Sequence, residues 1–270
     1  MRFTRLVSAF ITAGLILFTV ATPALAAPPA NDTFDNAIAI TSIPFSASLD
    51  TREATTDAID EEANADCGAP ATAASVWYTY TPTAAGALVL DMHGSSYSGG
   101  FLVVTGSPGN FVLENCGPQA IALLTEAGVT YHIMVLDDED SANGGDLTFT
   151  ITAAPPPPKV TLTADPIGYF DSETGTVNVS GTLSCTGEVE FSLLIAELHQ
   201  KVGRGEVVGG VGMEVACDGL TRPWSATIAP AFGTKFVGGK AASFTFAVAC
   251  GPVFCSEGFI EQTIKLRPVK

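Results

Sequence analysis

Short runs of apolar residues alternate with polar ones along most of the chain, and turn residues separate these runs. An apolar–polar period of two is typical of half-buried β-strands. The clearest example is 175–184, which reads GTVNVSGTLS. Runs of similar composition predict further strands at 75–80, 87–91, 101–105, 130–135, 147–151, 160–163, 190–198, 207–215, 224–228, 242–248 and 259–266. Because helical periodicity is nearly absent, we predict an all-β protein built from β-sandwiches.

A few segments depart from this pattern. Residues 33–39 predict one short helix, for which Asp32 is a suitable N-cap. Residues 191–199 also suit a helix by composition, but their neighbours favour a strand. The glycines of 203–205 and 209–210 lack the phosphate-loop pattern and a following helix, so they predict hairpin turns.

A run of four prolines at 155–158, preceded by two alanines, divides the chain. Such a run forms a stiff spacer and cannot lie inside a sheet. We therefore predict one sandwich over 27–152, a linker over 153–158 and a second sandwich over 159–270.

Residues 1–26 have the features of a secretory signal peptide. Arg2 and Arg5 precede an apolar stretch that ends near Val20, and an Ala-Leu-Ala pattern closes the segment at Ala26. An uncleaved membrane anchor is the alternative, but the stretch is short for a span. The sequence thus predicts an exported protein without stable membrane insertion after cleavage.

Six cysteines in an exported chain favour disulfides over a zinc site, for which the C-x₂-C spacing is missing. Two of them precede the proline run, so they pair with each other if no bond crosses between the domains. Among the other four we prefer one long-range bond and one clip across a hairpin turn. The predicted bonds are Cys67–Cys116, Cys185–Cys217 and Cys250–Cys255.

Charge is distributed unevenly between the halves. Residues 27–152 contain 17 acids and one base, Arg52, whereas residues 153–270 contain 11 acids and nine bases. An acidic surface repels phosphate backbones, which disfavours nucleic acid as a partner. It suits Ca²⁺ or cationic partners, and solubility alone is the other interpretation.

Several segments of the first half resemble, in order, the bacterial pre-peptidase C-terminal domain family. They are the opening at 31–37, the aromatic strand SVWYTYTP at 75–82, and the segments at 102–107, 127–135 and 144–151. The resemblance implies a jelly-roll-like sandwich that serves secreted enzymes as an accessory domain without chemistry of its own. Some relatives bind collagen and hold Ca²⁺ near the domain start, where this chain offers Asn31 and Asp32 but no preceding acids.

The second half resembles small secreted actinobacterial domains of uncharacterised function. The likeness rests on 175–185, on Cys217 with the Asp-Gly that follows it, and on Trp224. It implies an immunoglobulin-like sandwich and brings no activity with it.

Two acidic segments are candidate Ca²⁺ sites, because Ca²⁺ takes six to eight oxygen ligands. The first follows a predicted strand and comprises Asp137, Asp138, Glu139, Asp140, Asn143 and Asp146. The second comprises Asp57, Asp60, Glu61, Glu62 and Asp66. For both, a solvated loop is the alternative interpretation.

Catalytic motifs are poorly supported. His93, His132 and His199 lie outside any nucleophile-elbow pattern, and no pair of carboxylates is singled out. Trp77 and Trp224 lie within strand patterns and are expected in the core rather than in a ligand-stacking role. We therefore expect a secreted, non-catalytic binding or accessory protein that recognises an extracellular protein or polysaccharide surface. A secreted hydrolase or hydrolase inhibitor is the alternative.

Overall fold

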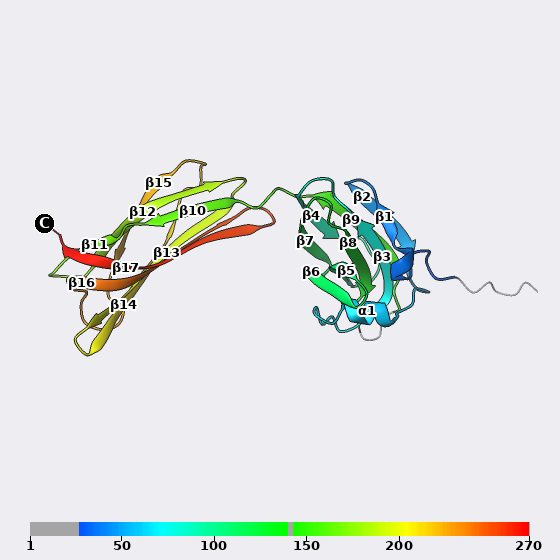
Figure 1. Ribbon diagram of the computed structural model, residues 1–270, viewed down its shortest axis with the longest axis horizontal. Coiled ribbons are helices and arrows are strands. Elements are labelled where there is room, and N and C mark those ends of the chain that lie inside the picture. The colour runs from blue at the N-terminus through cyan, green and yellow to red at the C-terminus, as the bar shows by residue number, and fades with distance from the viewer. Residues whose placement is uncertain (1–26, 140–142, 270) are drawn as a thin grey trace, which may run out of the picture.

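The computed structural model describes residues 27–139 and 143–269, and the predicted signal peptide lies outside these ranges. Within them, no helix is both long enough and apolar enough to cross a membrane. The regular structure is almost entirely strand, so the predicted all-β class is confirmed (Figure 1).

The first half folds into two facing sheets. One has the strand order β1-β3-β8-β5-β6 and the other β2-β9-β4-β7. The elements are η1 (Phe34–Asn36), β1 (Ile38–Ile40), β2 (Phe45–Asp50), α1 (Ala58–Ala63), β3 (Ala73–Tyr80), β4 (Gly86–Asp91), β5 (Gly100–Ser107), β6 (Asn110–Pro118), β7 (Ala120–Thr125), β8 (Tyr131–Asp137) and β9 (Asp146–Ala153).

The core of the first sandwich lies between these sheets, where Tyr78, Phe101 and Phe149 pack as an aromatic cluster. A smaller cluster around Trp77 and Met134 lies on the other face of the β1-β3-β8-β5-β6 sheet, beneath α1. This sheet is therefore buried on both faces, which explains why β3 and β8 are apolar almost throughout.

The second half is also a sandwich, and its strands are connected by hydrogen bonds into one continuous path. β15 and β10 pair with β12 in one layer, and β11-β17-β16-β13-β14 form the other. This order matches the immunoglobulin-like arrangement. The elements are β10 (Lys159–Ala164), β11 (Ile167–Phe170), β12 (Val177–Thr186), β13 (Phe191–Val202), β14 (Gly205–Glu214), β15 (Arg222–Ile228), β16 (Gly239–Cys250) and β17 (Cys255–Pro268).

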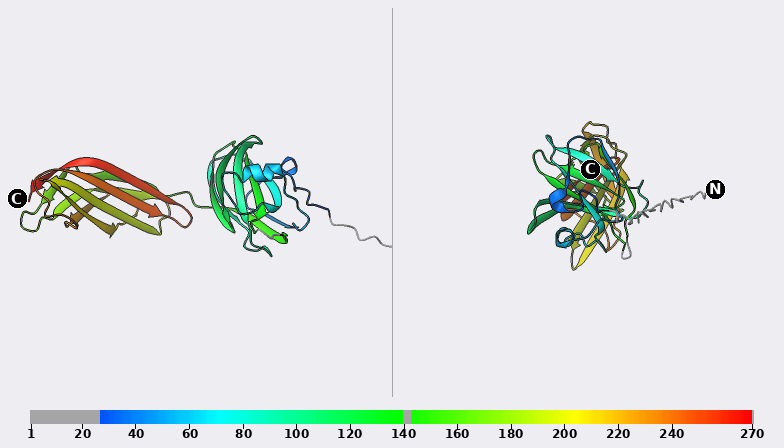
Figure 2. Two further views of the ribbon diagram at one scale, coloured as in Figure 1. Left: turned by 90° about the horizontal axis from the view of Figure 1, so that it is seen from below. Right: turned by 90° about the vertical axis from the view of Figure 1, so that its right-hand side faces the viewer.

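Figure 2 shows the two sandwiches as separate bodies joined by the segment between β9 and β10. This segment contains the four prolines 155–158. Among the described residues, no strand pairing connects the sheets of one half with those of the other.

The three predicted disulfides are confirmed: Cys67–Cys116, Cys185–Cys217 and Cys250–Cys255. The first ties the loop after α1 to β6, and the last closes the turn between β16 and β17. Because disulfides persist in oxidising compartments, the three bonds indicate that the protein works in an oxidising environment.

Three local expectations were wrong. The predicted helix at 33–39 is only the 3₁₀ turn η1, followed by β1, which pairs with β3. Residues 58–63 of the second acidic segment form α1 instead of an open loop. Gly209 and Gly210 lie inside β14 and not in a turn, and a Cβ at Gly209 would approach the carbonyl oxygen of Ala229 to 2.2 Å.

Candidate functional site

The second acidic segment anchors a helix to the core. Asp57 caps α1, and its side chain accepts from the backbone N–H groups of Ile59 and Asp60. Asp60 is 1% exposed. Its Oδ1 accepts from Trp77 Nε1 at 2.7 Å, and its Oδ2 accepts from the Asp57 N–H at 2.8 Å. Asp60 therefore holds α1 against β3 rather than presenting an oxygen to a cation.

Ser75 completes the surroundings of Asp60. Its hydroxyl has one proton but two acceptors at 2.9 Å, the Thr55 carbonyl and Asp60 Oδ2. The hydroxyl donates to these two oxygens, so Ser75 links Asp60 to the segment before α1. Burial raises the pKa of Asp60, and the hydrogen bonds that it accepts from the Asp57 N–H, Trp77 and Ser75 oppose this rise.

Asn31 and Asp32 have structural partners. Asn31 is buried, and its side chain donates to the Trp77 carbonyl at 3.0 Å. Asp32 accepts from the N–H of Thr55 at 2.6 Å and from its hydroxyl at 2.8 Å. The two residues join the segment before η1 to β3 and to the segment before α1.

The carboxylates of the first acidic segment also have separate partners. Asp137 is buried and accepts from the backbone N–H groups of Glu139 and Gly144. Asp146 is exposed and pairs with Arg52 at 3.0 Å. Asp140 lies outside the described residues.

Over 27–139 and 143–269, no group of three or more His, Cys, Asp or Glu side chains is placed to hold a metal. Ca²⁺ binding stays a prediction from the sequence.

The histidines form no nucleophilic pair in the hydrogen bonds of the described chain. His93 contacts Asp91 at 3.2 Å, and His199 contacts Glu197 and Glu206. The Nδ1 atom of His132 is buried without a partner, and its ring packs on Phe34. Carboxylates and an aromatic ring therefore surround these imidazoles.

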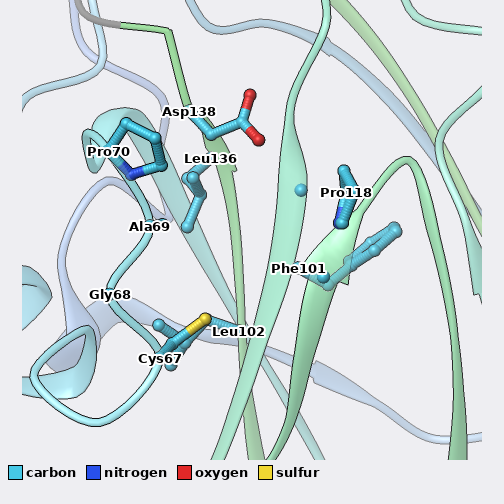
Figure 3. Close-up of a pocket in the computed structure, with 11 residues that line it drawn as sticks. Cys67, Gly68, Ala69, Pro70, Phe101, Leu102, Pro118, Leu136 and Asp138 are labelled. Carbon is cyan, nitrogen blue, oxygen red and sulfur yellow. The ribbon is translucent and has the colours of Figure 1, made fainter.

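A small pocket opens at one end of the β1-β3-β8-β5-β6 sheet (Figure 3). The loop after α1, the start of β5, the end of β6 and the end of β8 form its walls. Its volume is about 150 Å³. The lining residues are Cys67, Gly68, Ala69, Pro70, Gly100, Phe101, Leu102, Gly117, Pro118, Leu136 and Asp138.

Asp138 is the only charged residue among these. Asp138 is half-buried, and in Figure 3 its carboxylate lies between Pro70 and Pro118, away from Cys67 and Leu102, so we place it at the rim of the pocket. The Cys67–Cys116 bond brings the loop after α1 beside β6 and so forms one wall. Close packing of β5 on β6 forms another, since a Cβ at Gly100 would approach the Gly117 carbonyl oxygen to 2.8 Å.

Among the lining residues, the sequence indicated Asp138 as a candidate Ca²⁺ ligand and Cys67 as a disulfide partner, and it predicted no pocket. The pocket arises where four segments distant in sequence meet, and no local motif marks it. The two tryptophans are core residues as expected: Trp77 is 0% and Trp224 is 6% exposed.

No protein-family model and no curated protein matches the chain. The resemblance to the pre-peptidase C-terminal domain family therefore stays a prediction.

Among solved structures, a beta-glucuronidase from Parabacteroides merdae is similar over 72% of this chain and 27% of its own, at 10% identity and a TM-score of 0.28. A putative beta-galactosidase from Bacteroides fragilis is similar over 69% of this chain and 32% of its own, at 14% identity and a TM-score of 0.22. The chain spans less than two thirds of each of these proteins.

Proposed function

We propose that this chain is an exported, non-catalytic binding protein that attaches to lysine-bearing surfaces of extracellular proteins through its first sandwich. The observation that carries this proposal is the apolar pocket with Asp138 at its rim. An apolar cleft with a carboxylate at its mouth suits a side chain with an aliphatic stem and a cationic tip.

The size of the pocket selects the kind of ligand. Its volume is about 150 Å³. Drug-sized ligands occupy pockets of about 300–1,000 Å³, whereas a cavity of about 150 Å³ holds a single benzene ring. The pocket therefore accommodates one side chain, which favours a protein surface over a polysaccharide chain. Since Trp77 and Trp224 are buried, neither offers an exposed ring for sugar stacking.

The charge of the first half supports a cationic partner. Its 17 acids and one base attract lysine-rich surfaces over a range set by the Debye length, about 8 Å at physiological salt. The same field repels nucleic acid. The predicted signal peptide and the three disulfides support export as the setting.

The test compares binding of the full chain to immobilised polylysine and to succinylated polylysine by surface plasmon resonance. We expect binding to polylysine alone. Asp138→Asn should weaken it about tenfold, the scale of one charge-assisted contact. Glu53→Gln removes an equal charge at an exposed position outside the pocket and is the matched control, with an expected change below about twofold.

Equal effects of the two substitutions would show that only the overall acidity matters, and they would overturn the pocket as the binding site. No observation on the described residues specifically favours the alternative of a hydrolase or hydrolase inhibitor.

A further inference from the structure

The second sandwich carries an apolar stripe on the outer face of its larger sheet. Side chains alternate along β13, and Leu194, Ala196 and Leu198 point into the core. Residues 191, 193 and 195 therefore point outward. On the same face, Val248 and Phe246 of β16 lie opposite Leu193 and Ile195, Phe244 lies one row further along, and Phe259 of β17 lies opposite Phe246. Together they form the apolar stripe, which comprises Phe191, Leu193, Ile195, Phe244, Phe246, Val248 and Phe259.

The centre of the stripe is a single row across three strands. Ile195 is paired with Phe246, and Phe246 with Phe259. Phe191, Ile195 and Phe259 are 48%, 38% and 59% exposed, and the other four are half-buried. Apolar patches of this kind on a folded monomer mark interaction sites.

Carboxylates border the stripe on two sides. In the row on one side of the central row, Glu214 and Glu257 lie at the two ends of the pair Leu193 and Val248. In the row on the other side, Glu197 and Glu261 lie on either side of Phe244. The partner that complements this surface presents apolar side chains among lysines or arginines.

We propose that the apolar stripe is a docking site for a cationic amphipathic segment of another protein, a second binding site independent of the pocket on the first sandwich. Apolar side chains of that segment cover the row of Ile195, Phe246 and Phe259. Its cationic side chains meet the flanking glutamates.

A second copy of this chain is the less suitable occupant. With strands about 4.8 Å apart and about 6.6 Å between outward residues, three strands and four rows cover about 400 Å². A stable dimer buries about 800 Å² per partner. Packing the stripe on its own copy would also bring glutamates against glutamates, as with Glu257 and Glu214 across β17 and β14. Both arguments favour a segment of a different protein.

The test uses a fluorescent synthetic peptide of alternating leucine and lysine, and its anisotropy is measured with the full chain. Excess unlabelled serine–lysine peptide occupies sites that need charge alone. We expect saturable binding that weakens at least about tenfold in Phe191→Ser/Phe259→Ser. Phe232→Ser is the matched control, because Phe232 is 74% exposed and is not part of the stripe.

The glutamates that border the apolar stripe are tested by substitutions that leave its apolar residues unchanged. Glu257→Lys/Glu261→Lys should weaken binding about tenfold or more, whereas Glu173→Lys/Glu188→Lys, at exposed positions outside the stripe, should have less than about a twofold effect. Circular dichroism confirms that each variant is folded.

Two results would overturn the proposal. One is an unchanged affinity for the leucine–lysine peptide in both double variants, Phe191→Ser/Phe259→Ser and Glu257→Lys/Glu261→Lys. The other is sedimentation velocity in which the chain self-associates and Phe259→Ser makes it monomeric, which would make a second copy the occupant.

Discussion

At the scale of single residues, Asp60 explains why the second acidic segment packs against the core of the first sandwich. Its carboxyl group meets donors from α1 and from β3, and it is almost fully buried. A buried carboxyl is tolerated when each of its oxygens has a hydrogen-bond partner. The sequence displayed only a run of acids, in which this residue could not be told from its exposed neighbours.

Replacing Asp60 tests this role. Asp60→Ala leaves the buried Trp77 N–H without an acceptor, so we expect a loss of about 1–3 kcal/mol in the free energy of unfolding. Asp60→Asn keeps one acceptor for Trp77 and should lose less. Urea denaturation followed by circular dichroism measures both. A smaller loss for the alanine variant would contradict the hydrogen-bonding account.

The raised pKa of Asp60 gives a pH dependence with a fixed sign. Between its ordinary pKa of 3.8 and its higher folded value, the folded chain keeps a proton that the unfolded chain releases. The free energy of unfolding contributed by this group therefore decreases as pH rises through that window and then levels off.

Asp60→Asn removes this titration. The stability advantage of the wild type over the variant should be largest at the acidic end and should shrink as pH rises. Denaturation curves collected over that window for both proteins measure the difference. An advantage that grows with pH would mean that folding lowers the pKa of Asp60 and would contradict this account.

At the scale of elements, runs rich in aromatic and β-branched residues located most of the strands, and period-two alternation added those with one buried face. Both patterns failed for short elements that form through strand pairing or helix capping. β1 has three residues and exists because it pairs with β3, and α1 has six residues and depends on the Asp57 cap and on Asp60. The pocket was not predictable, because its walls are brought together only by the fold and by Cys67–Cys116.

Cys67–Cys116 and Cys250–Cys255 should stabilise the sandwiches that contain them by different amounts. Cys67–Cys116 closes a loop with a sequence separation of 49, and Cys250–Cys255 one of 5. Loop-closure entropy predicts losses of about 4 and about 2 kcal/mol when each pair is replaced by alanine.

Calorimetry of the full chain measures these losses. Each double variant should shift the transition of its own sandwich and leave the other in place. If a single double variant shifted both transitions equally, the halves would not unfold independently and the division at the proline run would be wrong.

At the scale of the whole molecule, the two halves differ in charge but offer similar chemistry. The first has a pocket with Asp138 at its rim, and the second has an apolar stripe bordered by glutamates. Both surfaces combine apolar contact with carboxylates, so both suit a cationic protein partner. Two weak sites on one chain reinforce each other when a partner reaches both.

The most direct test of lysine recognition is an amide chemical-shift titration of the full chain with Nα-acetyl-lysine amide. Nα-acetyl-norleucine amide, which has the stem without the ammonium group, is the control. We predict saturable shifts centred on Gly68, Gly117 and Asp138, absent in Asp138→Asn and much weaker with the norleucine compound. Shifts spread over the acidic surface of the first sandwich, or unchanged by Asp138→Asn, would contradict a lysine-binding pocket.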